Sequence, residues 1–178
     1  MPHYLAQAPS LRPGEDPAGH YLREGWQAGL SPHPLFDVGW YVGQAGRGAR
    51  GSPPLLHYLG EGWRKGLSPH PLFDPDWYLE RRPDVAEAGQ EPLTHFLTFG
   101  AEEGASPGPW FDLPHYVAAR GAGLQPGVNP LVDYLQGGAW RVTEARPGFP
   151  TAAYLASRPE LAKDGLTPLE HWARQAQR

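Results

Sequence analysis

The chain contains no cysteine among its 178 residues, which excludes disulfide bridges and thiolate metal ligands. It has no basic run, and its formal net charge of −4 at pH 7 argues against a surface that neutralises nucleic-acid phosphates. No apolar stretch approaches the roughly 20 residues that a membrane-spanning helix needs. We therefore expect neither a nucleic-acid partner nor insertion into a membrane.

Signals for export and for catalysis are also missing. The first residues, Met-Pro-His-Tyr-Leu-Ala-Gln, contain neither a basic n-region nor an apolar h-region, so we expect no signal peptide and a cytoplasmic location or a signal-independent route of export. There is no P-loop, and the serines of the repeated linkers read as linker or cap residues. We expect a protein that is not an enzyme, with no catalytic residues, cofactor or bound metal.

What the chain does contain is one unit of 37 or 38 residues, repeated five times. The aromatic residues that open the units are Tyr4, Tyr41, Tyr78, Tyr116 and Tyr154. A second aromatic series follows 17 or 18 residues later and comprises Tyr21, Tyr58, Phe96, Tyr134 and Trp172. Such a period is typical of solenoids, whose stacked units share a core. We expect a single solenoid domain over 1–178, with repeats at 1–36, 37–73, 74–111, 112–149 and 150–178.

Each unit carries signals for two short helices and a Pro-rich connector, which predicts an all-α fold. Aspartate is a favoured N-cap, so first helices are expected to follow Asp37, Asp74 and Asp112. The second helices are expected to begin at a proline, which is tolerated in the first turn. A capping-competent residue precedes that proline in Asp16-Pro17, Asn129-Pro130 and Thr167-Pro168, whereas Glu91-Pro92 lacks one and Pro53-Pro54 is a variant.

The second helix has an apolar stripe that we expect to face the core. In the second unit its members are Leu55, Tyr58, Leu59, Gly62 and Trp63. Glycine recurs at one position of the stripe, which predicts either a close approach by a neighbouring helix or the end of the helix. Besides the second aromatic series, the residues assigned to the repeat core are Trp26, Trp40, Trp63 and Trp77.

The units contain short segments of one pattern, namely Phe73-Asp74, Trp77-Tyr78-Leu79, Pro83-Asp84-Val85, His57-Tyr58-Leu59 and Gly62-Trp63. This pattern resembles a family of bacterial repeats. These repeats accompany glycosyltransferases of capsule and cell-surface polysaccharide synthesis, and they occur in some hemolysin-type secreted proteins. The resemblance covers essentially the whole chain and implies an accessory module tied to polysaccharide. The chain has no room for a transferase domain and lacks the Gly-Gly-x-Gly-x-Asp calcium motif, so the resemblance implies neither activity here.

Histidine and tryptophan supply the candidate binding residues. The histidines at one repeat position, His20, His57, His95 and His171, lie too far apart in a helical stack to share a metal, and we expect each to bond a neighbouring loop carbonyl. His33 and His70 lie in Ser-Pro-His-Pro linkers, which we expect at the surface, where a ligand could contact them. Trp110 and Trp140 depart from the repeat pattern and are expected to be exposed and to bind the ligand.

Two classes of function follow, with an enzyme as a third. The first is a non-catalytic module that binds bacterial cell-surface or capsular polysaccharide through exposed aromatic rings. The alternative is a structural or adaptor protein that binds another protein within a larger assembly. Repeat folds host many functions, so the architecture does not choose between them. The resemblance favours the polysaccharide.

Overall fold

The computed structural model describes residues 2–141, 144–161 and 165–177. Helix is the regular secondary structure of these residues, and β pairing is limited to isolated bridges such as His33 with Phe36. The predicted all-α class is therefore confirmed. The chain divides into two compact units, Met1–His70 and Pro71–Arg178, which are described separately. The single domain expected over 1–178 stays a prediction.

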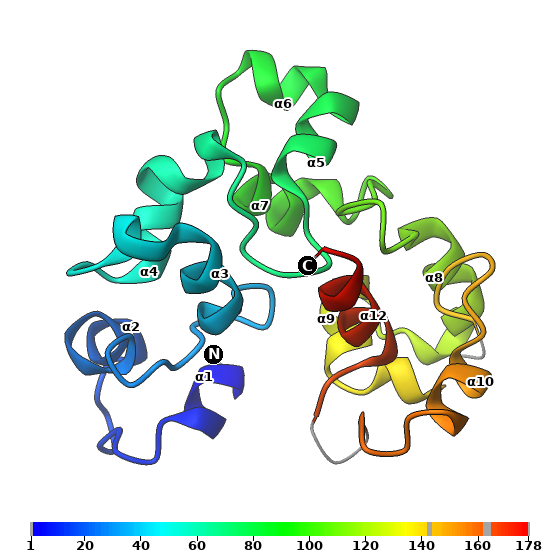
Figure 1. Cartoon of the computed structure of the whole chain (residues 1–178), viewed down its shortest axis with the longest axis horizontal. Helices are drawn as coiled ribbons and strands as arrows, with labels where there is room; N and C mark the ends of the chain where they lie inside the picture. Colours follow the sequence, from blue (N-terminus) through cyan, green and yellow to red (C-terminus); the bar gives the residue numbers. More distant parts are fainter. Residues whose placement is uncertain (1, 142–143, 162–164, 178) are drawn as a thin grey trace. The chain divides into compact units, whose positions relative to one another are not determined.

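The first compact unit holds four short α-helices, drawn from blue to cyan in Figure 1. They are α1 (Pro2–Gln7), α2 (Pro17–His20), α3 (Val38–Ala45) and α4 (Pro54–His57). Single π turns follow α2 and α4, at Tyr21–Gly25 and Tyr58–Gly62. Short 3₁₀ segments occupy Gly46–Ala49 and Trp63–Lys65. Every helix is at most eight residues long, so its stability comes from packing rather than from intrinsic helix propensity.

The second compact unit repeats these elements from green to red (Figure 1). Its α-helices are α5 (Pro75–Arg81), α6 (Pro83–Glu87), α7 (Pro92–His95), α8 (Leu113–Arg120), α9 (Pro130–Leu135), α10 (Thr151–Ala156) and α12 (Pro168–Ala176). A π turn spans Phe96–Gly100, and 3₁₀ segments span Gly121–Gly123 and Gly138–Arg141. Helix α12 lies beside α9, where the Leu169 backbone N–H donates to the Tyr134 hydroxyl over 3.0 Å.

Local sequence signals determine where the helices begin. The carboxylates of Asp37, Asp74 and Asp112 accept the backbone N–H three residues later, at 2.8, 3.0 and 2.9 Å. The second helices begin at proline, as the sequence indicates. The expectation that Glu91 does not cap is wrong, because its two carboxylate oxygens accept the N–H groups of Leu93 and Thr94 at 2.8 and 2.7 Å.

The second helices of the first three repeats run into π turns, and their buried side chains differ from the expected stripe. In a π turn the backbone bond returns five residues instead of four, as from the Ala101 N–H to the Phe96 carbonyl. The histidine and the aromatic residue after it are buried in all three repeats. The next leucine, expected in the core, is exposed instead, by 45% at Leu22, 39% at Leu59 and 36% at Leu97.

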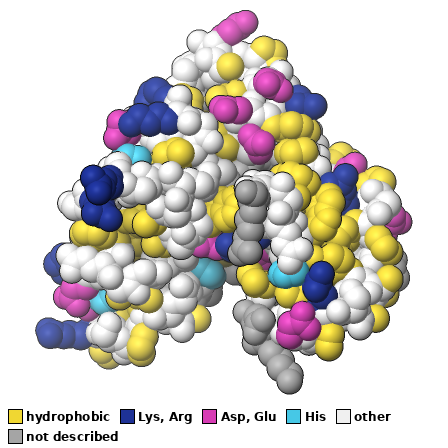
Figure 2. All heavy atoms as spheres, viewed as in Figure 1, with side chains coloured by type: hydrophobic (Ala, Val, Ile, Leu, Met, Phe, Trp, Pro, Cys, Tyr) yellow, Lys and Arg dark blue, Asp and Glu magenta, His cyan; other side chains and the backbone are white. Residues whose placement is uncertain are grey.

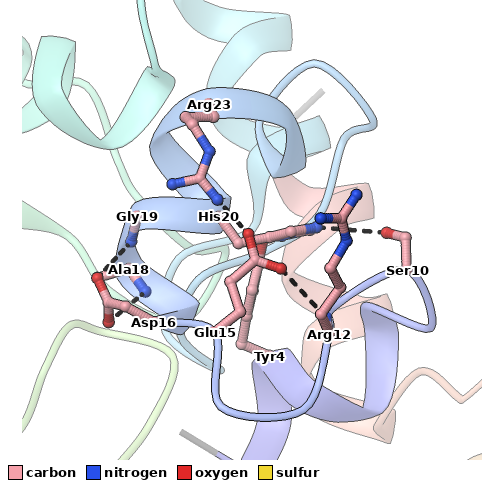
Figure 3. A network of polar contacts seen from close by, with 9 residues as sticks. All are labelled: Tyr4, Ser10, Arg12, Glu15, Asp16, Ala18, Gly19, His20 and Arg23. Carbon is pink, nitrogen blue, oxygen red and sulfur yellow. Dashed lines mark hydrogen bonds and ion pairs between the residues drawn. The ribbon is translucent and has the colours of Figure 1, made fainter.

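A tyrosine, a histidine and a glycine meet at the centre of most repeats. Hydrogen bonds join the tyrosine hydroxyl to histidine Nδ1 in the pairs Tyr4–His20 (2.6 Å), Tyr41–His57 (2.5 Å), Tyr78–His95 (2.9 Å) and Tyr154–His171 (2.7 Å). In Figure 3 the Tyr4 ring extends towards His20, whose Nε2 meets the Ser10 hydroxyl. The histidine thus bonds a tyrosine of its own repeat and not a loop carbonyl.

The recurring glycine is explained by the same contact. A Cβ atom added at Gly25, Gly62 or Gly100 would overlap the tyrosine hydroxyl of the same repeat, and at Gly138 it would overlap that of Tyr116. The sequence predicted either a close approach or a helix end. The close approach is the reason, and the group that approaches is a side-chain hydroxyl.

The fourth repeat replaces the histidine with Asp133. The Tyr116 hydroxyl donates to Asp133 Oδ2 at 2.5 Å, and Arg120 donates through Nε and Nη2 to the two carboxylate oxygens at 2.7 and 3.1 Å. Burial raises the pKa of Asp133, but the hydrogen bonds from Arg120 and Tyr116 outweigh it and hold the pKa below its ordinary value. The carboxylate is therefore ionised and paired at neutral pH.

Aromatic packing forms the rest of the core. The side chains of Tyr41, Tyr58, Phe96, Tyr116 and Tyr134 are fully buried, and Tyr21 nearly so. Edge-to-face contacts join the two series, as between Tyr41 and Tyr58 with ring centroids 5.7 Å apart. Among the tryptophans assigned to the core, Trp63 is buried. The other four are half-buried: Trp26, Trp40, Trp77 and Trp172.

Candidate functional site

The linker between repeats departs from its own pattern in the second compact unit. Linkers one and two share the run Ser-Pro-His-Pro-Leu-Phe-Asp, with His33 and His70 at its centre. In linker three, glycine stands at the histidine position (Gly108), and tryptophan replaces the leucine (Trp110). In linker four the histidine position holds Arg146. The motif that linkers one and two share is thus altered at two positions in linker three and at five of its seven positions in linker four.

Two of these altered residues, Gly108 and Arg146, line a depression beside Trp77. A hollow of about 270 Å³ is lined by Trp77, Ser106, Gly108, Pro109, Phe111, Asp112, Arg146 and Pro147. A second hollow, of about 530 Å³, is lined by Trp77, Tyr78, Arg81, Arg82, Glu103, Gly104, Ala105 and Ser106. Trp77 and Ser106 belong to both, so the hollows adjoin. We call the pair the Trp77 groove.

Helix α5 positions the indole of Trp77. Asp74 caps the helix by accepting the Trp77 backbone N–H, and the neighbouring Tyr78 is buried in the core and fixes the rotation of the helix. The Arg81 guanidinium lies 3.8 Å from the centre of the indole ring, within the range of a cation–π contact. The ring is therefore held on a short, anchored helix, and Trp77 lines both hollows.

An ion-pair network forms the wall of the larger hollow. Arg82 donates to both oxygens of Asp84, at 3.0 and 2.7 Å, and to Glu103 Oε2 at 2.6 Å. The hydrogen bond from Arg82 lowers the pKa of Asp84 to about 2. A carboxylate held ionised in this way accepts hydrogen bonds but is a poor proton donor at neutral pH. The network suits hydroxyl binding better than acid–base catalysis.

Arg146 lines the smaller hollow, and two tryptophans that do not line it, Trp110 and Trp172, pack close to this arginine. The rings of Trp110 and Trp172 meet edge to face, with centroids 5.0 Å apart. The Arg146 guanidinium lies 5.2 Å from the Trp172 ring, and its Nη1 donates to the Pro109 carbonyl at 3.1 Å. The expectation of an exposed ring is wrong for Trp110, which is partly buried against Trp172. Its binding role stays a prediction.

Trp140 lies apart from the residues that line the groove. Its side chain is 42% exposed on the 3₁₀ segment Gly138–Arg141, next to the buried Ala139. The predicted exposure of this ring therefore agrees with the structure. Whether it contacts a ligand stays a prediction.

The two linker histidines are less accessible than their positions indicate. His70 is only 2% exposed, contrary to the expected surface location. His33 is partly buried, and its Nδ1 accepts the Leu35 backbone N–H at 3.1 Å. Burial, with smaller contributions from the nearby imidazoles of His3 and His70, lowers the pKa of His33 to about 4. These contacts place His33 in the packing of the linker.

The low pKa of His33 predicts acid sensitivity of the first compact unit. An unfolded histidine titrates near pH 6.5, so between pH 6.5 and 4 the unfolded chain binds a proton that the folded chain does not. The free energy of unfolding should fall by about 2 kcal/mol over this range. Urea unfolding at several pH values measures the fall. His33→Asn, which keeps a hydrogen-bond acceptor, should flatten the profile, and equal slopes for both proteins would refute the assignment.

Two short glycine patterns match enzyme motifs in sequence but not in structural context. Gly104–Gly108 reads Gly-x-Ser-x-Gly, but the Ser106 hydroxyl oxygen accepts the Leu113 backbone N–H at 3.0 Å in a linker between helices. Gly46–Gly51 reads Gly-x-Gly-x-x-Gly, but it follows α3 and not a strand. Neither has the strand–turn–helix context that its chemistry requires.

Neither a metal-binding cluster nor a broad surface of one charge marks a second site among the residues and on the face described below. No group of three or more metal-ligating side chains with suitable geometry occurs in the described ranges 2–141, 144–161 and 165–177. None of the helices built from those residues is long and apolar enough to cross a membrane. On the face drawn in Figure 2, the described basic and acidic side chains are interspersed and form no broad basic patch. The electrostatic footprint of a nucleic-acid binder is not seen on that face.

Reading the sequence by its repeat pattern missed the groove. Trp77 matches the pattern at the position of Trp40, so the pattern predicts that it lies in the core. The pattern predicts no binding role for Gly108 or Arg146. Aligning the four linkers position by position shows Gly108 and Trp110 as the two departures in linker three, and Arg146 as one of five in linker four. That signal was present in the sequence, but their proximity to Trp77 was not.

Comparison with known proteins returned no match to a family model, to a curated protein or to a solved structure. The resemblance to polysaccharide-associated repeats therefore stays an expectation.

Proposed function

We propose that the protein is a non-catalytic module that binds a polysaccharide, of the cell-surface or capsular kind, in the Trp77 groove. The observation that carries the proposal is that one indole ring borders two adjoining hollows. Two adjoining open hollows that share one tryptophan suit a polymer that continues past it. A small, enclosed ligand would instead favour a closed cavity.

The lining of the groove has the chemistry that sugars require. A sugar ring presents an apolar face, which an indole can cover, and a rim of hydroxyls, which need charged or polar partners. Glu103 and Ser106 supply acceptor oxygens, and Arg82 and Arg146 supply donors. Because Arg82 is held by Asp84 and Glu103, these groups are ordered before a ligand arrives, which reduces the entropy lost on binding.

We further propose that the five repeats stack as a short solenoid. Contacts between successive repeats support this in the second compact unit, where Arg146 of the fourth repeat donates to the Pro109 carbonyl of the third, and the Leu169 N–H of the fifth repeat donates to the Tyr134 hydroxyl of the fourth. Contacts within a repeat hold its linker in place. The Asp37 N–H donates to the Pro69 carbonyl, and the Asp74 N–H donates to the Pro107 carbonyl, at 2.9 and 3.0 Å. The amide of Gln44 also pairs with the Ser68 backbone through two hydrogen bonds. Each of these linkers thus closes on the first helix of its own repeat, while the bonds of Arg146 and Leu169 join one repeat to the next, as in a solenoid.

A protein partner is the second candidate function. The leucines turned outward beside the π turns, Leu22, Leu59 and Leu97, recur at one repeat position, and Phe99 beside the last of them is 54% exposed. Exposed apolar side chains that recur in this way favour a protein interface. Substituting Leu97 and Phe99 with serine tests this candidate without altering a residue of the buried core.

Trp77→Ala tests the polysaccharide proposal. We expect saturable binding of isolated capsular polysaccharides or arrayed glycans to weaken by about tenfold or more, because the central aromatic contact is lost. The matched control is Trp40→Ala, at the same repeat position, where the indole N–H donates to the Ser68 hydroxyl at 3.2 Å. Circular dichroism should show folded protein in both cases.

Equal losses in the two variants would indicate a general effect on the fold and not a binding site at Trp77. A complete absence of glycan binding by the unaltered protein would overturn the proposal and favour the protein partner. In that case, loss of a captured partner on changing Leu97 and Phe99 would support the second candidate.

A further inference from the structure

We propose that the smaller hollow of the Trp77 groove recognises an anionic sugar, with the Arg146 guanidinium pairing with the sugar's carboxylate. This inference rests on the proposed polysaccharide function and names the class of its ligand. It is carried by a difference between the two arginines that line the hollows. Arg82 is paired with two carboxylates, whereas Arg146 contacts neutral groups.

The contacts of Arg146 leave most of its donors for a ligand. One N–H of Nη1 donates to the Pro109 carbonyl, and the guanidinium lies near the Trp172 ring. Within the described residues, no carboxylate forms an ion pair with it. Since guanidinium has five N–H donors in a planar fork, the remaining donors can form a bidentate pair with a carboxylate. Arg82, by comparison, already donates three hydrogen bonds to Asp84 and Glu103.

The surroundings hold this arginine in a fixed orientation. The Trp172 ring, itself packed against Trp110 and Phe149, lies 5.2 Å from the guanidinium, and the carbonyl of Pro109 fixes one nitrogen. An oriented, partly buried guanidinium loses little freedom on binding and is screened less than an exposed one. Trp77 borders the same hollow, so a sugar ring against the indole can bring its carboxylate to Arg146.

Asp112 is the opposing charge in this hollow. Its Oδ1 accepts the His115 backbone N–H at 2.9 Å at the start of α8, so its charge is partly offset by that helix end. An anion in this hollow can therefore bind the Arg146 guanidinium, which has N–H donors without a partner among the described residues. The neighbouring Asp112 carboxylate is already hydrogen-bonded. Arginine occupies this linker position in the fourth linker, where the first two have histidine and the third has glycine.

Oligogalacturonates and the same oligomers with methyl-esterified carboxylates test the inference. The two probes share the sugar ring and differ in charge. Isothermal titration of the full chain should show the acidic oligomer binding about tenfold to a hundredfold more tightly, the range expected for a charge-assisted pair. Arg146→Gln should abolish this preference, while Arg146→Lys should retain part of it.

Arg64→Gln is the matched control. Arg64 also lies over a tryptophan, 4.3 Å from the Trp63 ring, and also donates to a backbone carbonyl, that of Gly60, but it is outside the groove. Its substitution should leave the preference unchanged.

The outcomes separate this inference from the proposed function. Equal binding of both oligomers, lost in Trp77→Ala and unaffected by Arg146→Gln, would overturn the anionic inference while supporting the polysaccharide site. A preference for the acidic oligomer that survives Arg146→Gln would also overturn it. Absence of binding to these oligomers and to every arrayed acidic or neutral glycan would overturn both.

Discussion

Gly62→Ala is expected to lower the free energy of unfolding by about 3 kcal/mol or more. A Cβ atom at this position would overlap the Tyr41 hydroxyl oxygen and would lie 3.1 Å from Tyr41 Cζ and 3.4 Å from the His57 carbonyl. The hydroxyl cannot move away freely, because it is bonded to His57 Nδ1 at 2.5 Å and its ring is fully buried. Overpacking of a rigid core is a recognised source of large destabilisation.

Two companion variants make this prediction specific. Tyr41→Phe removes the obstructing oxygen and costs about 1 to 2 kcal/mol by leaving His57 without its partner. The double variant should therefore be more stable than the sum of the two losses predicts. Gly60→Ala, where nothing lies within 4 Å of the added Cβ, should be neutral or slightly stabilising. Urea unfolding followed by circular dichroism measures all four proteins, and additive losses would contradict the explanation of the repeated glycine.

Arg120→Ala should destabilise the fourth repeat by about 3 to 5 kcal/mol, the usual cost of leaving a buried carboxylate without its cation. The side chains of Arg120 and Asp133 are only 6% and 16% exposed, so water cannot fully replace the lost partner. Arg82→Ala is the control at the same repeat position. Its partners Asp84 and Glu103 are more than half exposed, so that pair should be worth about 1 kcal/mol or less.

The other repeats indicate how to rescue Arg120→Ala. The second repeat has Ala45 where the fourth has Arg120, and its tyrosine bonds a histidine. Adding Asp133→His should therefore restore most of the lost stability by converting the fourth repeat to that arrangement. Thermal and urea unfolding of the single and double variants measure the recovery. A double variant no more stable than Arg120→Ala would show that the two arrangements are not interchangeable.

The helix boundaries could be predicted because their causes are local. An aspartate that caps the first turn and a proline that fits it act within three residues, so Asp37, Asp74 and Pro54 mark helix starts in the sequence itself. The outward leucines could not be predicted in this way. The spacing of Tyr58, Leu59 and Trp63 also fits an α-helical stripe, and the π turn at Tyr58–Gly62 is not signalled by that spacing.

The groove shows the same limit more strongly. Trp77, Gly108 and Arg146 come from a helix and from two different linkers, and no short-range rule relates them. Each could be noticed in the sequence as a repeat residue or a departure from the pattern. Their meeting around one indole is a property of how successive repeats pack, which had to be seen in the structure.

The central claim is that a saccharide binds against Trp77, and the indole N–H signals of the seven tryptophans test it most directly. In a two-dimensional ¹H–¹⁵N NMR spectrum, with each signal assigned by substitution to phenylalanine, titration with oligogalacturonate should shift Trp77 most, with smaller shifts at Trp110 and Trp172. Trp26, Trp40 and Trp63, in the first compact unit, should stay in place. Shifts centred on Trp140, or on the first compact unit, would contradict the assignment of the groove.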